Sequence, residues 1–159
     1  MSESASVTEE NIAIRLLSDL IPLVSHVIVS ESTKQAIGFT GVAVKQTQRL
    51  DFPFLKDIYD RTPGLSSDKL KSVLELIWKV LGASKEQPKG IVLAYDEAQN
   101  LSDQANSHQY PLSLLLDVFQ SLQKRGCPYL LVLTGLPTLF PKLVDARTYS
   151  DRMFHVITL

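Results

Sequence analysis

Two short apolar runs, each preceded by an amphipathic helical pattern, constrain the fold of this 159-residue chain more than any other feature. Residues 91–95 have the sequence IVLAY and residues 129–133 the sequence YLLVL, so neither run alternates apolar with polar side chains. Uninterrupted apolar runs of this length are typical of strands buried on both faces of a parallel sheet. The chain is therefore predicted to be an α/β protein, with a mostly parallel sheet and helices on both faces.

Helices are predicted where apolar residues recur at intervals of three and four. The segment capped by Ser66 or Ser67 and ended by Gly82 carries such a stripe: Leu70, Val73, Leu74, Ile77 and Leu81. A second stripe precedes the helix-ending sequence KRGCP at residues 124–128: Leu112, Leu115, Leu116 and Phe119. These two helices and the two apolar runs alternate along the chain, which favours parallel strands joined by helical crossovers.

Less regular elements complete the sequence. Residues 26–30 and 36–44 are β-branched and contain glycines, which predicts short strands or an irregular hairpin. Residues 47–66 contain two prolines and a glycine, so a loop with one helical turn is expected. Residues 139–146 are predicted to form a short helix, and residues 153–158 a third strand.

The N-terminal residues 1–7 are polar and are predicted to be a disordered tail. Thr8 is expected to cap a helix whose apolar stripe ends at Leu20 and which Pro22 would end or kink. No repeat or linker divides the remaining sequence, so residues 8–159 are predicted to form a single domain.

Charge and cysteine content exclude several classes of protein. Sixteen Lys and Arg residues against 17 Asp and Glu residues give a net charge of −1, so no bulk positive charge would attract nucleic acid. The apolar stretches are too short to span a membrane, and the acidic N-terminus lacks the basic start of a signal peptide, so a cytoplasmic protein is expected. Cys127 is the single cysteine, which excludes an internal disulfide and an all-cysteine metal site. The three histidines do not have the spacing of metal ligands.

Two carboxylates directly follow the first apolar run. The carboxyl ends of parallel strands face the ligand crevice of an open sheet. Asp96 could there ligate a phosphate-bound Mg²⁺, and Glu97 could activate a water as a general base. The alternative is that Asp96 only caps the following turn and that Glu97 is solvated.

A hydroxyl and two arginines follow the second apolar run. Thr134 could hydrogen-bond a terminal phosphate or its attacking water, or could only cap the next helix. Arg147 and Arg152 could reach a phosphate as permanently charged donors, or could form surface salt bridges with Asp145 or Asp151.

In this order and at these spacings, the acidic pair, the threonine and the arginines resemble the AAA family of P-loop ATPases, most of all its origin-recognition and STAND-type branch. The resemblance covers roughly residues 67–159. It implies ATP and Mg²⁺ as cofactors, with Asp96 as the metal ligand of the Walker B strand and Glu97 as the catalytic carboxylate. It also implies that Thr134 occupies the sensor 1 position.

The same resemblance implies that Arg152 is an arginine finger that completes a neighbouring subunit's site, with Arg147 as the second candidate. Gln99 ends an Asp-Glu-Ala-Gln box, at a position that varies and indicates little. None of the seven glycines begins the Walker A pattern Gly-x-x-x-x-Gly-Lys-Ser/Thr. The expected fold is thus an incomplete P-loop NTPase core that begins after the Walker A loop and ends before the helical lid.

Such a chain is expected to hydrolyse ATP poorly or not at all by itself. Its open sheet edges would pair with another protein chain or with a second copy. The alternative is a non-enzymatic, degenerate ATPase domain that acts as an interaction or regulatory module, lending Arg152 to an intact partner subunit or blocking it. A helicase-like motor is a weaker alternative, because no basic or aromatic surface supports it.

Overall fold

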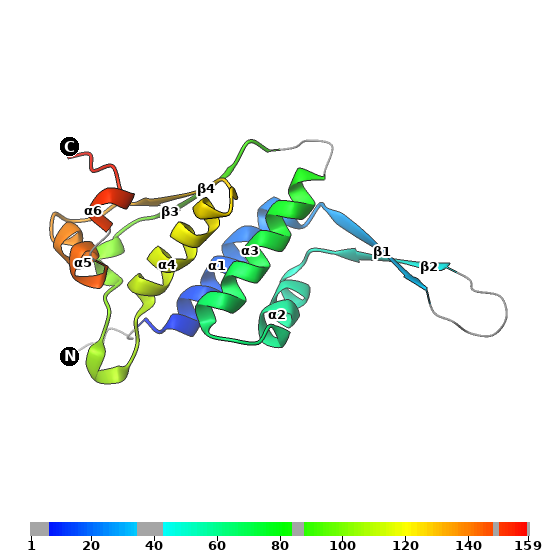
Figure 1. Ribbon diagram of the computed structural model, residues 1–159, viewed down its shortest axis with the longest axis horizontal. Helices are drawn as coiled ribbons and strands as arrows, with labels where there is room; N and C mark the ends of the chain where they lie inside the picture. Colours follow the sequence, from blue (N-terminus) through cyan, green and yellow to red (C-terminus); the bar gives the residue numbers. More distant parts are fainter. Residues whose placement is uncertain (1–6, 35–42, 84–87, 148–149, 159) are drawn as a thin grey trace.

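The computed structural model describes residues 7–34, 43–83, 88–147 and 150–158. In chain order its elements are α1 (Glu9–Val24), β1 (Ile28–Lys34), β2 (Ala43–Arg49), α2 (Phe52–Arg61), α3 (Ser66–Gly82), β3 (Ile91–Tyr95), the 3₁₀ turns η1 (Ala98–Asn100) and η2 (Ala105–Ser107), α4 (Pro111–Lys124), β4 (Tyr129–Leu133), α5 (Leu139–Ala146) and α6 (Ser150–Met153). Helices α1, α3 and α4 lie side by side, and the strands β3 and β4 lie alongside α4 (Figure 1).

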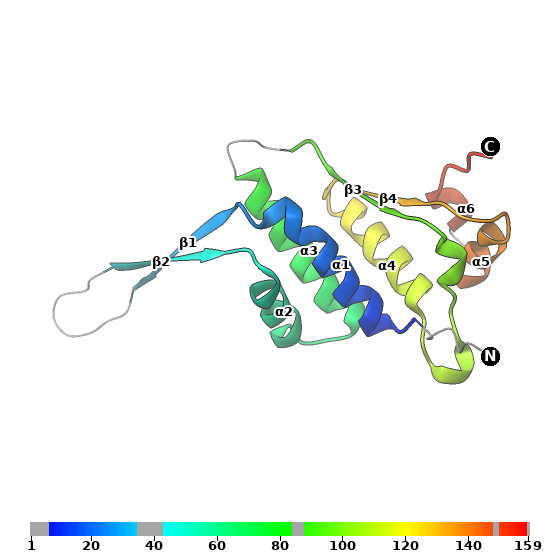
Figure 2. The same ribbon diagram turned by 180° about the vertical axis from the view of Figure 1, so that it is seen from behind.

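The described strands form two separate two-stranded sheets. β3 and β4 are parallel, with Ile91 opposite Tyr129 and Tyr95 opposite Leu133. The parallel pair and its flanking helices confirm the α/β prediction at this coarse level. The antiparallel hairpin β1–β2 extends away from the helices, as both views show (Figures 1 and 2).

The β3–β4 sheet is covered on one face only among the described residues. Leu93 and Leu131 are buried against the helices, whereas Val92 is 61% exposed and Leu130 is 52% exposed. The prediction that both strands are buried on both faces, between two layers of helices, is therefore wrong for these positions. An apolar run indicates that both sides of a strand can be buried, but it does not say whether an element covers the second side.

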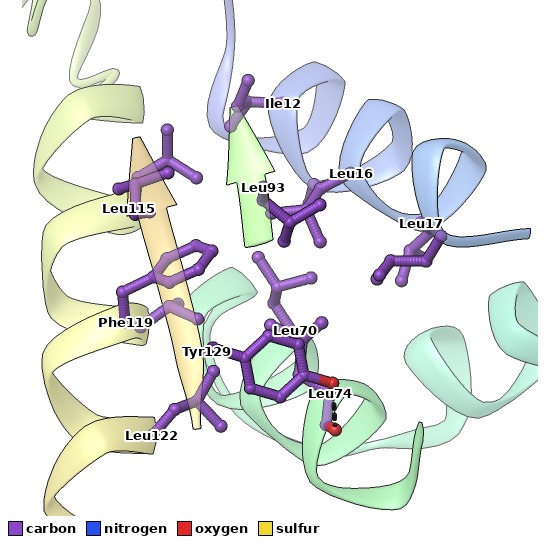
Figure 3. Close-up of a cluster of buried hydrophobic side chains, with 14 of the residues drawn as sticks. Ile12, Leu16, Leu17, Leu70, Leu74, Leu93, Leu115, Phe119, Leu122 and Tyr129 are labelled. Atoms are coloured by element: carbon purple, nitrogen blue, oxygen red, sulfur yellow. Dashed lines mark hydrogen bonds between the residues drawn. The ribbon is translucent and has the colours of Figure 1, made fainter. Parts of the chain in front are cut away.

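The buried face of the sheet contributes to the main hydrophobic core (Figure 3). The Phe119 and Tyr129 rings meet edge to face, with centroids 6.3 Å apart. The Tyr129 hydroxyl donates a hydrogen bond of 2.8 Å to the Leu74 carbonyl of α3. Burial raises the pKa of Tyr129 above its usual value, so the hydroxyl remains a donor. This aromatic pair fixes β4 against both α3 and α4.

Helix α1 begins as the sequence predicts, because the Thr8 hydroxyl accepts a hydrogen bond of 3.1 Å from the Asn11 amide. Pro22 does not end the helix, which continues to Val24. Residues 1–6 of the predicted tail lie outside the described residues.

The first turn of α1 is joined to a segment about 100 residues later in the chain. The Glu9 amide donates to the Gln109 side-chain oxygen at 3.0 Å, and the Tyr110 amide donates to the Glu9 carboxylate at 3.1 Å. These reciprocal hydrogen bonds connect the start of α1 to the segment that leads into α4.

Three sequence predictions are corrected by the structure. The expected loop at residues 47–66 contains the ten-residue helix α2, because Asp51 caps it and Pro53 lies in the first turn, where no amide donor is needed. The expected strand at residues 153–158 is wrong: α6 ends at Met153, and residues 154–158 have no strand pairing among the described residues. The hairpin strands are shifted, and residues 36–42 of the second predicted strand lie outside the described residues.

Among the residues that the structure describes, no helix has both the length and the apolar character needed to cross a membrane.

Candidate functional site

Asp96 and Thr134 meet at the carboxyl ends of the two parallel strands. They are brought together by the strand register, because Tyr95 and Leu133, the residues before them, are paired. The Thr134 hydroxyl donates a hydrogen bond of 2.5 Å to Asp96 Oδ1, and the Thr134 amide donates to the Tyr95 carbonyl at 2.9 Å. A carboxylate and a hydroxyl 38 positions apart in the sequence thus form one polar site.

The Asp96 carboxylate is exposed and accepts two hydrogen bonds through one oxygen atom. Besides Thr134, the Glu97 amide donates to Asp96 Oδ1 at 2.8 Å. These bonds, that from Thr134 first, hold the pKa of Asp96 below its usual value, because they stabilise the ionised form. The site therefore presents a negative charge to solvent at neutral pH.

Glu97 adopts a left-handed backbone conformation, with φ of 51° and ψ of 36°. For a residue with a Cβ, this conformation costs about 1–2 kcal/mol. The turn lets the Ala98 amide donate to the Thr134 carbonyl at 2.9 Å, while the Glu97 side chain stays exposed. Such backbone strain is found most often at functional sites, which makes its position beside Asp96 informative.

Gln99 belongs to the same region, although sequence reasoning gave it no role. Its side-chain oxygen accepts a hydrogen bond of 3.2 Å from the Leu136 amide. Its backbone carbonyl accepts one of 2.6 Å from the Lys142 ammonium group of α5. No local sequence pattern reveals these contacts, because they join positions 37 and 43 residues apart.

Arg147 makes a different contact from the one predicted for it. Its guanidinium forms two hydrogen bonds with the carboxylate of Asp117 in α4, at 3.0 and 2.6 Å, and a third of 3.2 Å with the Ala146 carbonyl. This ion pair fixes the end of α5 against α4 and agrees with the alternative that Arg147 forms a salt bridge, although with Asp117 as the partner. Arg152 lies in α6, and its side chain is exposed.

A mostly apolar groove of about 560 Å³ lies next to Thr134. One side is formed by the turn after β4 and by α5, including Leu136 and Phe140. Residues 154–158 form the other side and contribute Phe154 and Ile157. The polar site is thus bordered by a hollow that can accept an apolar group.

Within the described ranges, no cluster of three or more His, Cys, Asp or Glu side chains could hold a metal ion. A metal ion at Asp96 would therefore have at most two protein ligands of these types within the described ranges. This donor set is suited to Mg²⁺ that is held mainly by phosphate oxygens and water, and is unsuited to an all-protein metal site.

Comparisons of this chain with models of protein families, with curated proteins and with solved structures find no match.

Proposed function

We propose that this chain supplies the Walker B, sensor 1 and arginine-finger part of an AAA-type ATP-binding and ATP-hydrolysing domain. The observation that carries the proposal is the hydrogen bond between Thr134 and Asp96 at the ends of neighbouring parallel strands. Phosphoryl transfer to water requires a metal-binding carboxylate and a water- or phosphate-orienting group close to the same phosphate. The two side chains satisfy this requirement of proximity.

The roles are those that the family resemblance implies, and the surroundings of the residues support some of them. Asp96 is ionised and exposed, so it would hold Mg²⁺ directly or through a water; when bound, Mg²⁺ offsets the negative charge of the phosphates. The Glu97 carboxylate would accept a proton from water, and the Thr134 hydroxyl would donate to a phosphate oxygen. The family resemblance assigns Arg152 as the arginine finger, with Arg147, which pairs with Asp117, as the second candidate.

The chain does not fit the phosphates of ATP themselves. Its seven glycines provide no Walker A loop, and thus no row of backbone amides followed by a lysine. No hydrolytic step is therefore assigned to the chain alone. We expect turnover only where another segment or subunit supplies the phosphate-binding loop.

The test is an NMR titration of the folded chain with ATP, with and without Mg²⁺. We expect weak, millimolar binding that shifts the backbone resonances of Asp96, Glu97 and Thr134 only when Mg²⁺ is present. Asp96→Asn should abolish these shifts. Asp145→Asn removes another exposed carboxylate from the neighbouring helix α5 and should leave them unchanged.

Two outcomes would contradict the proposal in different ways. Micromolar binding would mean that a complete phosphate site exists without a Walker A loop. An absence of Mg²⁺-dependent shifts at Asp96 and Thr134 would mean that the polar site is not a nucleotide site.

The second candidate is a non-enzymatic interaction module that pairs with an intact ATPase subunit. It is favoured by the uncovered face of the β3–β4 sheet, where the register partners Val92 and Leu130 are both exposed. Parallel sheets are usually covered on both faces. In this case association with the partner, measured by sedimentation, should be lost in Val92→Glu and unaffected by Asp96→Asn.

A further inference from the structure

The turn after β4 is connected to residues 98–99 by two hydrogen bonds. The Thr134 carbonyl accepts from the Ala98 amide at 2.9 Å, and the Leu136 amide donates to Gln99 Oε1 at 3.2 Å. Leu136 is 60% exposed, so apolar packing contributes little to fixing this turn. Its geometry therefore depends on the polar contacts.

Gln99 is itself fixed at two points. Lys142 of α5 donates to its backbone carbonyl at 2.6 Å, while the Gln99 side chain reaches the turn. Residues 96–99 and 134–136 thus form one hydrogen-bonded unit, in which the Thr134 hydroxyl donates to the Asp96 carboxylate.

We propose that Gln99 is a positioning residue. It holds the turn after β4 so that the Thr134 hydroxyl keeps its hydrogen bond to the Asp96 carboxylate. The inference rests on the proposed function only in taking Asp96 and Thr134 as the working site. Gln99 would orient Thr134 through the turn, because its side-chain oxygen accepts from the Leu136 amide.

Gly135 provides an independent reason to assign this role to Gln99. A Cβ placed on Gly135 would collide with Gln99 Oε1, the atom that accepts from Leu136. Gly135 does not have a positive φ, so alanine is compatible with its backbone. Gly135→Ala would therefore displace the Gln99 side chain without removing it, because that side chain is the flexible partner.

The experiment compares five variants with the native chain in the absence of nucleotide. Gln99→Met keeps the length of the side chain and removes the acceptor, whereas Gln99→Glu keeps an acceptor oxygen in place. Gly135→Ala displaces the acceptor, and Gln99→Ala, alone and combined with Gly135→Ala, tests whether both act through one contact. The readouts are hydrogen exchange of the Leu136 amide and the scalar couplings that report the χ1 angle of Thr134.

We expect exchange of the Leu136 amide to accelerate roughly five- to tenfold in Gln99→Met and in Gly135→Ala, as for the loss of one hydrogen bond. In both variants Thr134 should change from one χ1 rotamer to an average of several. In Gln99→Glu the couplings of Thr134 should stay as in the native chain, because an acceptor oxygen remains. Adding Gly135→Ala to Gln99→Ala should change nothing more, because the contact is already lost.

A merely structural role for Gln99 predicts a different result. Exchange at Leu136 would accelerate, but Thr134 would keep its single rotamer in Gln99→Met and Gly135→Ala, and this would overturn the proposal. Should Gln99→Met fail to fold, Gly135→Ala still decides, since it keeps Gln99 in the chain. Because nucleotide is absent, the result is independent of whether the ATP titration succeeds.

Discussion

The β3–β4 sheet has a packed side and a polar end, which are held by different forces. On the packed side Leu93, Leu131 and Tyr129 are buried against helices. At the polar end Asp96 and Thr134 are exposed and are held by short hydrogen bonds, next to a strained backbone at Glu97. The comparison teaches that stability and candidate chemistry are separated along the same two strands, with a strained backbone next to the polar end.

The largest expected effect tests the packed side. Leu131→Ala should lower the free energy of unfolding by about 2–5 kcal/mol, because it leaves a cavity beneath the sheet. Leu130→Ala is the matched control: the neighbouring residue is 52% exposed on the opposite face and should cost less than about 1 kcal/mol. Urea denaturation measures both. Equal losses would mean that the outer face is also covered in solution.

A smaller loss of stability is expected when the ion pair between Arg147 and Asp117 is broken. This pair is a polar contact that lies away from the strand ends. Arg147→Met should lower the free energy of unfolding by about 1 kcal/mol, because both side chains are about one-third exposed and solvent weakens the pair. Addition of 1 M salt should reduce the difference between the native chain and the variant. An unchanged free energy of unfolding in Arg147→Met would contradict a stabilising role of this ion pair.

A gain in stability is expected from relieving the strain at the polar end. Glu97→Gly should raise the free energy of unfolding by about 0.5–1 kcal/mol, because glycine adopts the left-handed conformation without the Cβ penalty. Glu97→Ala removes the same carboxylate but keeps the penalty, so it should give no gain. If both variants behave alike in thermal unfolding, the backbone at Glu97 is not strained.

The smallest effect concerns pH. The Thr134 hydroxyl helps to lower the pKa of Asp96 in the folded chain. The hydrogen bond to the ionised Asp96 carboxylate therefore stabilises the fold fully at pH values above the pKa that Asp96 has in the unfolded chain. This stabilisation is lost as the pH falls through the lower pKa that Asp96 has in the folded chain. In Thr134→Val the pKa of Asp96 should rise toward its usual value, and stability should depend less on pH below about 4. NMR titration of the Asp96 carboxyl carbon measures the change, and an unaltered pKa would contradict it.

Much of the fold could be predicted, because its signals are local in the sequence. The stripes at residues 70–81 and 112–119 and the two apolar runs specify α3, α4, β3 and β4 directly. Helix α2 could not be predicted from a proline-rich segment, since proline breaks a helix interior but is well tolerated in the first turn. Residues 154–158 have the composition of a strand but lack a partner strand among the described residues.

The candidate site shows the same limit. The proximity of Asp96 and Thr134 could be predicted from the sequence, because each follows an apolar run and the carboxyl ends of neighbouring parallel strands lie at the same edge of a sheet. The partner of Arg147 and the role of Gln99 could not, since both depend on how α5 packs against distant segments. Neither contact has a sequence pattern of its own.

The reciprocal hydrogen bonds between Glu9 and residues 109–110 have a consequence for the order of events during synthesis. Helix α1 is synthesised before these residues, since the groups that complete its first turn are made about 100 residues later. Helix α1 is therefore expected to remain incompletely docked until residues 109–110 have been translated. Contacts of such long sequence separation form late, because their chain-closure entropy is compensated only once the rest of the core has assembled.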